Sequence, residues 1–206
     1  MQKRLVRKTN FGILLLAVLA VFSFTSCDSP STESDEDIDE AKTETETEAV
    51  SITKQEVLDA QKTWGEGIVT IGKAYSDEGD YVAAARKHIE NLYGYDMGEV
   101  LFKPTLAAEK QFRTTFEGAL SYFVGGDENY PEDHGFAIKP WTNVRWESTG
   151  IITEGNMAVA MGNYYFTPAD GSDEVKVEYT FGYTKDKEGN LKIILHGSHL
   201  PYAGHK

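Results

Sequence analysis

The chain has 206 residues, with 33 acidic side chains against 20 basic ones and a formal net charge of −13. This balance argues against nucleic acid as a partner, because binding a phosphate backbone takes clusters of Lys and Arg. The single cysteine excludes an intramolecular disulfide.

Residues 1–26 have the pattern of a lipoprotein signal peptide. Four basic residues and no acid precede an apolar run over residues 11–24. The run has about 14 residues, whereas a membrane span needs roughly 20, and it fits the apolar core of a signal peptide. It ends in Phe-Thr-Ser-Cys, which resembles a bacterial lipobox. We therefore expect Cys27 to be lipidated and to anchor the protein to a membrane outside the cytoplasm.

Residues 27–49 are expected to form an acidic, disordered tether. Their ten acids repel one another, and too few apolar residues are present to form a core. Acids close to the cysteine resemble cell-surface export signals of some Gram-negative lipoproteins, whereas Asp28 resembles an inner-membrane retention signal of other bacteria. The periplasmic face and the cell surface both stay open as locations. Residues 50–206 then form one folded domain.

Three helices are expected in the first part of this domain. Thr53 and Glu56 have the spacing of a capping box at the start of the first helix. The apolar stripe of this helix is spaced by three and four residues and consists of Val57, Ala60, Trp64, Ile68, Ile71 and Tyr75. Asp80 caps a second helix, whose inward residues are Val82, Ala85, Ile89 and Leu92. A third helix covers residues 115–124.

After Pro140 the pattern changes to strands. Apolar and strand-forming residues cover four segments, which are residues 141–146, 157–166, 175–183 and 191–199. Turn signals separate them, and Gly162 and Gly182 within strands indicate a bend or a close approach. Helices followed by consecutive hairpin strands predict an α+β fold, in which N-terminal helices pack on a strongly bent antiparallel sheet.

The order of these elements resembles the cone-shaped nuclear transport factor 2-like superfamily. Long motifs are similar to those of the iota-class carbonic anhydrases, which are related to the association domain of calmodulin-dependent kinase II. These motifs are VLFKPT (100–105), AAEKQFR (107–113), EGALSYFVGG (117–126), GFAIKPW (135–141), AMGNYYF (160–166), VEYTFGY (177–183) and LHGSHLPY (195–202). The resemblance implies reversible hydration of CO2 to bicarbonate, in some members without a metal, in a pocket between the concave sheet and the helices.

The resemblance also assigns the residues of the site. Thr105 and Tyr122 match the hydroxyl ligands of bicarbonate, while His196 and Ser198 match the first and third positions of an HHSS-type motif. Chemically, the hydroxyls can donate to the substrate and Ser198 can orient a water. The imidazole is the nearby group in sequence that could shuttle a proton near neutral pH.

Two positions depart from the family motif. Gly197 stands where the family has a histidine, and His199 stands where it has a serine. If only the first and third positions matter, the site is intact. If the second matters, the departure favours a non-catalytic module of the same superfamily that binds a small ligand or serves in assembly.

The last strand presents a conflict between its two faces. Its more apolar positions, residues 191, 193 and 195, alternate with the positions of His196 and Ser198. Strict alternation would therefore turn the two site residues away from the side that normally faces the core. Either the apolar side packs at a subunit interface, or a bulge intervenes.

A zinc site is the competing hypothesis for the chemistry, and manganese is also not excluded. The candidate ligands are His88, His134, His196 and His199. Catalytic zinc commonly takes three protein ligands, yet only the last two are close in sequence, at a spacing that splits them across a strand. We therefore expect no metal and no other cofactor.

A homodimer is expected by analogy, because folds of this superfamily commonly pair through the convex face of the sheet. The aromatic-rich segments 164–166 and 179–183 would suit such an interface. The expected partners are thus CO2 or bicarbonate, the membrane that holds the lipid, and a second copy of the chain.

Overall fold

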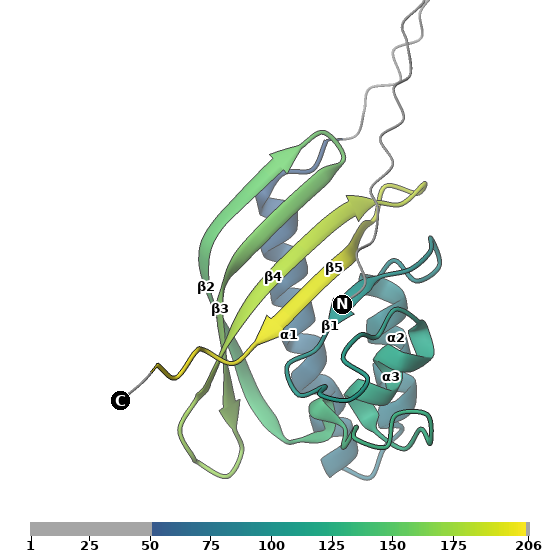
Figure 1. The fold of residues 1–206 in the computed structure, drawn as a ribbon, viewed down its shortest axis with the longest axis vertical. Helices are drawn as coiled ribbons and strands as arrows, with labels where there is room; N and C mark the ends of the chain where they lie inside the picture. Colours follow the sequence, from purple (N-terminus) through teal and green to yellow (C-terminus); the bar gives the residue numbers. More distant parts are fainter. Residues whose placement is uncertain (1–50, 205–206) are drawn as a thin grey trace, which may run out of the picture. The chain divides into compact units, whose positions relative to one another are not determined.

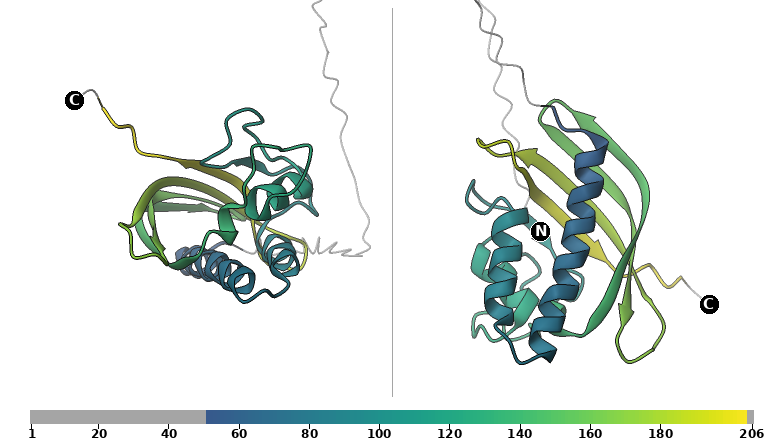
Figure 2. Two further views of the ribbon diagram at one scale, coloured as in Figure 1. Left: turned by 90° about the horizontal axis from the view of Figure 1, so that it is seen from below. Right: turned by 180° about the vertical axis from the view of Figure 1, so that it is seen from behind.

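The computed structural model describes residues 51–204. The expected signal peptide, the lipidated Cys27 and the tether lie outside these residues. Within them, no helix is both long enough and apolar enough to cross a membrane. Three α-helices and a short 3-10 helix, Phe136–Ile138, accompany a single sheet. Figures 1 and 2 show α1 lying along one face of the curved sheet, with α2 and α3 beside it.

The helices begin where the sequence predicts. Before α1 (Lys54–Ser76), the Thr53 side chain accepts from the Glu56 N–H over 3.2 Å, and the Glu56 carboxylate accepts from the Thr53 N–H over 2.7 Å. Asp80 caps α2 (Tyr81–Leu92), and Thr115 caps α3 (Phe116–Val124). The prediction that Tyr75 belongs to the buried face of α1 is wrong. Its side chain is 46% exposed, because it lies in the last turn of the helix.

Five strands form one open sheet in the order β1-β5-β4-β3-β2. The strands are β1 (Leu101–Lys103), β2 (Trp141–Glu154), β3 (Met157–Pro168), β4 (Val175–Lys185) and β5 (Leu191–His199). β2 to β5 form the expected antiparallel meander, and β1 extends the sheet by pairing in parallel with β5. The α+β fold with helices on a strongly bent sheet is therefore confirmed (Figure 1).

Two glycines allow the close approaches that accompany the bend. In β2 the register shifts at Thr149, and a Cβ atom on Gly162 of β3 would lie 2.2 Å from the carbonyl oxygen of Glu147. A Cβ atom on Gly182 of β4 would lie 2.9 Å from the Cβ atom of Leu195 in β5. Both glycines thus mark close approaches of strands, as expected.

The aromatic side chains of β3 and β4 fill the core. Strand alternation directs them toward the helices, and the buried ones are Tyr164, Phe166, Tyr179, Phe181 and Tyr183. This corrects the expectation that these aromatic rings would form an outer interface. The exposed large side chains on the outer positions of the β2–β3 hairpin are instead Ile152, Met157, Val159 and Met161.

A bulge in β5 resolves the conflict between the faces of that strand. Ile193 and Leu195 pair with two neighbouring residues of β4, which leaves Ile194 as an extra residue between them. Before the bulge Ile193 is buried, and after it His196 and Ser198 are buried. The bulge proposed from the sequence is confirmed, and it turns both site residues toward the core.

Candidate active site

Three hydroxyl groups from separate parts of the chain meet in the interior. Thr105 follows β1, while Tyr164 belongs to β3 and Ser198 to β5. The Ser198 Oγ atom lies 2.5 Å from both the Thr105 Oγ1 atom and the Tyr164 hydroxyl oxygen. The parallel pairing of β1 with β5, which places Lys103 opposite Gly197, brings the segment after β1 to this point.

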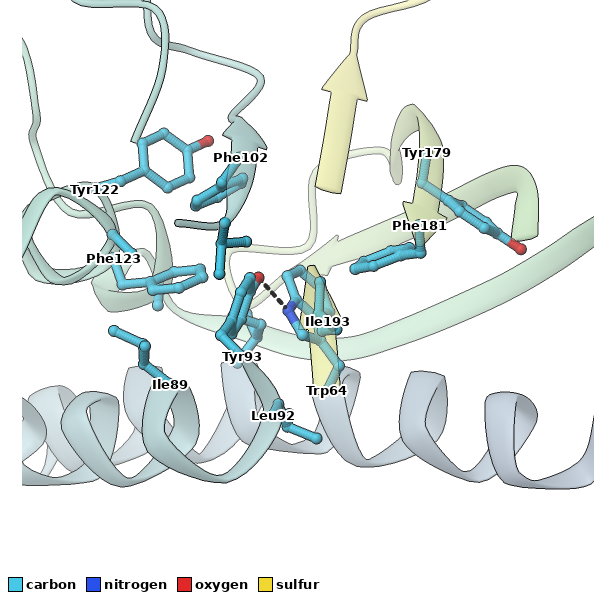
Figure 3. Packing of buried hydrophobic residues seen from close by; sticks show 14 of the residues in the cluster. Trp64, Ile89, Leu92, Tyr93, Phe102, Tyr122, Phe123, Tyr179, Phe181 and Ile193 are labelled. Carbon is cyan, nitrogen blue, oxygen red and sulfur yellow. Dashed lines mark hydrogen bonds between the residues drawn. The ribbon is translucent and has the colours of Figure 1, made fainter. Parts of the chain in front are cut away.

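The imidazole of His196 extends this cluster into the core. Its Nε2 atom lies 3.3 Å from the Tyr164 hydroxyl, and its Nδ1 atom lies 2.9 Å from the Tyr93 hydroxyl. The indole N–H of Trp64 donates to the same Tyr93 oxygen over 2.9 Å (Figure 3). We call the connected groups, from Trp64 through Tyr93, His196, Tyr164 and Ser198 to Thr105, the hydroxyl chain.

The hydrogen atoms of the hydroxyl chain have one consistent direction. Because Trp64 donates to the Tyr93 oxygen, the single Tyr93 proton is left for the Nδ1 atom of His196, its other partner among the described residues. Nδ1 is then the acceptor of the neutral imidazole, and Nε2 carries the hydrogen. Donation continues from Nε2 to Tyr164, then to Ser198, and last to Thr105. The Thr105 hydrogen then lies at the edge of the site, where the Tyr122 phenol is a further hydrogen-bond partner of Thr105.

Burial keeps the hydroxyl chain uncharged. It lowers the pKa of the His196 imidazole to about 3, and the imidazole stacks against the rings of Phe102 and Phe181, with centroids 4.6 and 4.1 Å away. Burial also raises the pKa of the Tyr93 and Tyr164 phenols well above the usual value. At neutral pH the imidazole is neutral and both phenols are protonated, so they can act as donors.

A small cavity adjoins the hydroxyl chain. Its volume is about 10 Å³, which is roughly the space of one water molecule. Thr105, Tyr164 and Ser198 supply its hydroxyl groups. The rings around it are those of Trp64, Phe102, Tyr122, Phe123, Phe136 and Tyr164. The site therefore places aromatic rings beside hydroxyl groups that can contact the oxygens of a small ligand.

A larger pocket of about 650 Å³, which we call the vestibule, lies outside the cavity. The two share Thr105, Tyr122 and Phe136 as lining residues. Burial raises the pKa of the Tyr122 phenol, which keeps the hydroxyl protonated. Thr105 and Tyr122 thus stand at the boundary between the cavity and the vestibule.

Two neighbouring carboxylates fix the loop that follows Thr105. The Glu132 carboxylate accepts backbone N–H groups over 2.8 to 2.9 Å from Ala108, Glu109 and Lys110. These hydrogen bonds lower the pKa of Glu132 to about 2. Asp133 lies 2.7 Å from the guanidinium of Arg113, which is fully buried. The wall of the vestibule is therefore held by charged groups that already have partners.

The structure brings together the four residues that the sequence predicts for the site. Thr105, His196 and Ser198 belong to the hydroxyl chain, and Tyr122 lines the same cavity. The altered motif positions do not reach it. A Cβ atom on Gly197 would lie 3.4 Å from the ring of the exposed His199, on the opposite face of β5.

The four histidines considered as zinc ligands are dispersed. His88 is buried between the helices, His134 lines the vestibule, His196 lies in the hydroxyl chain and His199 is exposed. In residues 51–204, no three His, Cys, Asp or Glu side chains are grouped as a metal site would require. The zinc hypothesis therefore has no ligand set in this part of the chain.

Three members of the hydroxyl chain do not stand out as site residues in the sequence. The spacing of Trp64 indicates only the apolar stripe of the first helix, Tyr164 is one of several aromatic residues in its segment, and no pattern marks Tyr93. A Trp or Tyr in a core has to find a hydrogen-bond partner for its polar end. That rule marks these residues as members of a buried polar network, but it cannot name the partner, which for Tyr93 is 103 residues away in sequence.

Residues 55–200 match the family described as metal-independent carbonic anhydrase. A metal-independent carbonic anhydrase from Nostoc sp. (strain PCC 7120) is 47% identical over 155 residues, which make up 74% of this chain and 75% of that protein. The crystal structure of an iota-carbonic anhydrase from a cyanobacterium, complexed with bicarbonate, has a TM-score of 0.73 at 45% identity and covers 75% of this chain and 96% of its own. An NTF-2 like protein of unknown function from Shewanella oneidensis MR-1 has a TM-score of 0.44 at 12% identity, covering 70% and 97%.

Proposed function

The chain belongs to the metal-independent carbonic anhydrase family, and on this premise we propose how its residues catalyse the reversible hydration of CO2 to bicarbonate. The family and the bicarbonate-bound relative support this reaction without a metal cofactor. The observation that carries the proposal is the hydroxyl chain, whose last hydrogen is left at Thr105 beside a cavity of aromatic rings.

CO2 binds where the cavity meets the vestibule, with its oxygens toward the hydroxyl groups. The molecule has no net dipole, so rings such as Phe102 and Phe136 can surround it at little desolvation cost. Thr105 and Tyr122 donate to an oxygen of the substrate from the side of the vestibule. The protonated state of the Tyr122 phenol, which follows from its raised pKa, is the state that this contact requires.

The hydroxyl chain stabilises the charge that develops during the reaction. As a water oxygen bonds to the carbon, a CO2 oxygen gains negative charge, and donors already aimed at it lower the barrier. His196 acts as a positioning residue, since its Nε2–H group orients Tyr164 and, through it, Ser198. With a pKa near 3, this imidazole is a poor acceptor for the water proton, so we assign it this role in place of the expected proton shuttle.

The attacking water comes from the vestibule, the wider of the two spaces. A new bond forms between its oxygen and the carbon, and one carbon–oxygen double bond gives its electron pair to the oxygen held by Thr105 and Tyr122. One water proton stays on the product, and the other leaves through the vestibule. The products are bicarbonate and a proton, and the reverse steps dehydrate bicarbonate.

A non-catalytic ligand-binding module is the alternative that the altered motif favoured. Gly197 and His199 lie on the face of β5 opposite to His196 and Ser198, so the alteration leaves the lining of the cavity unchanged. This placement supports catalysis over the alternative.

We propose in addition that the protein is exported and held to a membrane by lipid on Cys27. The support is the sequence of residues 1–27, in which a basic segment, a short apolar run and a lone cysteine follow one another. Mass spectrometry of the protein from a bacterial membrane fraction should find a lipidated N-terminal cysteine. An intact N-terminus at Met1 would contradict export by this route.

A homodimer is proposed with the outer face of the β2–β3 hairpin as its contact. Ile152, Val159 and Met161 are 69%, 43% and 53% exposed on this face. Covering such side chains with a second copy removes apolar surface from water. Light scattering on the purified protein should give the mass of two chains, and the mass of a single chain would contradict the proposal.

The catalytic proposal is tested by stopped-flow CO2 hydration with the purified protein, with and without a metal chelator. We expect activity that survives the chelator. Replacing Tyr122→Phe removes one donor to the developing charge and should lower kcat roughly a hundredfold. Activity lost to the chelator and restored by a divalent ion would contradict the metal-free mechanism.

Tyr165→Phe is the matched control, because it removes a phenol whose hydrogen bond to Glu147 lies on the exposed outer face. Its rate should equal that of the unmodified protein. A folded protein that shows no hydration at all would favour the ligand-binding alternative.

A further inference from the structure

Hydration of CO2 releases a proton that the hydroxyl chain is not arranged to take. Its hydrogens point from Trp64 toward Thr105, so the hydroxyl chain presents a donor to the cavity, and a neutral hydroxyl oxygen is too weak a base to take a proton from the water. Its inner end at Trp64 is buried, and an indole nitrogen can only donate a hydrogen bond and cannot accept a proton. The proton that leaves the water therefore needs a base on the side of the vestibule.

His134 is the imidazole that lines the vestibule together with Thr105 and Tyr122. Its side chain is exposed and makes no hydrogen bond or ion pair with the residues at positions 51–204. Of the other histidines described, His88 and His196 are buried, and His199 lies on the outer face of β5. Imidazole is the side chain that takes up and releases protons near neutral pH.

The backbone on both sides of His134 is fixed by the fold. Asp133 is held by Arg113 at 2.7 Å and by the Ser121 hydroxyl at 2.7 Å. Gly135 is buried with φ of 79°, and a Cβ atom there would lie 2.6 Å from the Ile138 side chain. The main chain therefore holds the imidazole at this wall of the vestibule, although the ring contacts no hydrogen-bond partner among residues 51–204.

The other charged and titratable groups of the vestibule are poorly suited to accept the proton. Glu132 already accepts three backbone N–H groups, and Asp133 is paired with Arg113. The Lys139 ammonium lies 4.9 Å from the centroid of the Trp141 ring and has no lone pair to offer. The phenols that line this pocket, those of Tyr75 and Tyr122, donate hydrogen bonds when protonated.

We propose that His134 transfers the proton between the site and the solvent during CO2 hydration, an inference that rests on the proposed function. The proton released as the water oxygen bonds to carbon passes through vestibule water to a free ring nitrogen of His134. It then leaves this imidazolium for a buffer base in solution, which returns the imidazole to its neutral form. Bicarbonate keeps the other hydrogen of the water, so each cycle transfers one proton to the buffer. In dehydration the same groups carry the proton inward.

The test compares His134→Ala with the unmodified protein at low and high concentrations of imidazole buffer. Proton release to solvent follows the formation of bicarbonate, so kcat should fall roughly tenfold in dilute buffer while kcat/KM is unchanged. Concentrated imidazole buffer should restore kcat, because a free imidazole can enter the vestibule and accept the proton. His134→Gln, which keeps a polar side chain without an exchangeable imidazole, should behave in the same way.

His199→Ala is the matched control, because it removes an exposed histidine from the other face of the sheet. Its kcat should equal that of the unmodified protein at every buffer concentration. The inference is overturned if both His134 variants keep full kcat in dilute buffer, or if they lose kcat and kcat/KM together without recovery in imidazole. An unmodified protein without CO2 hydration would overturn the proposed function itself, which is a different outcome from an active protein that is indifferent to His134.

Discussion

Tyr93 illustrates how a side chain far from the substrate can set the chemistry at the site. Its hydroxyl is buried between one donor, Trp64, and one partner that can accept, His196. A buried hydroxyl without an acceptor costs free energy, so the proton of Tyr93 fixes the tautomer of the imidazole. That tautomer in turn decides whether Thr105 offers a hydrogen or a lone pair. The direction of the hydrogen bonds at the site is thus set by Tyr93, which lies deeper in the core than the hydroxyls that line the cavity.

At this scale the altered C-terminal motif can be tested directly. Gly197→His restores the residue that the family has at the second position, and its side chain would extend beside His199 on the outer face. We expect kcat for CO2 hydration to stay within about twofold, because surface substitutions of this kind rarely disturb a fold. Stopped-flow assays of the variant and the unmodified protein make the comparison. A large gain in rate would mean that the outer face of β5 takes part in catalysis.

The residues proposed for the site could be selected from the sequence to the extent that they lie in contiguous motifs. Thr105, Tyr122, His196 and Ser198 each stand in a segment that resembles the family. The order of the hydrogen bonds among them was not predictable, since it depends on Tyr93 and on burial that lowers the pKa of His196. Neither property is a feature of local sequence.

The strands β2 and β3 approach each other so closely at Gly162 that the position has no space for a Cβ atom. At Gly162 the extra residue of β2 comes so close that a Cβ atom would meet backbone atoms, which cannot move aside as the end of a flexible side chain can. The bend at this point gives the sheet the curvature that lets β3 place Tyr164 in the hydroxyl chain. A change here should therefore alter stability first and the site second.

Gly162→Ala tests this argument. The added Cβ atom would lie 2.2 Å from the Glu147 carbonyl oxygen, and relieving such overpacking should cost about 2 kcal/mol of the free energy of unfolding. Gly150→Ala is the matched control in β2, since a Cβ atom there meets nothing within 4 Å and should change stability by no more than about 0.5 kcal/mol. Urea unfolding followed by circular dichroism measures both. Equal stability of the two variants would refute the close approach.

Elements were predictable where their signals are local. The caps at Thr53 and Asp80 placed two helix starts correctly, because a cap is made by residues three positions apart. β2 was expected to end at Trp146 and continues to Glu154, since its second half lacks alternation and is extended by pairing with β3. The two possible explanations for β5 could be separated only once its partners were known.

At the scale of the whole molecule, two buried imidazoles connect folding to pH. Burial lowers the pKa of His88 to about 4 and that of His196 to about 3. In the unfolded chain these histidines take up protons with the ordinary pKa of about 6.5, whereas in the folded chain they stay neutral to a lower pH. Stability is therefore fully present above pH 6.5 and is lost as the pH falls toward the lowered values.

Between pH 7 and pH 5 each buried histidine should remove about 2 kcal/mol from the free energy of unfolding. The carboxylates with lowered pKa, such as Glu56 and Glu132, titrate mainly below this window, so the histidines dominate it. Urea midpoints from tryptophan fluorescence at the two pH values measure the loss. His88→Phe, which keeps a ring beside Trp64 without a titrating group, should show a smaller loss. A variant that keeps the full pH dependence would show that His88 is not a source of it.

The pairing of β1 with β5 also sets when activity can appear during folding. Phe102 pairs with His196, and contacts so distant in sequence form late because a long loop has to close first. Thr105 and Ser198 meet only after this closure, which needs the C-terminal strand in place. A partly synthesised or partly folded chain can form α1 and its cap, yet it has no hydroxyl chain and cannot turn over CO2. Activity therefore appears only when the fold is complete. After dilution from denaturant, the rate of CO2 hydration should recover later than the helical circular dichroism signal.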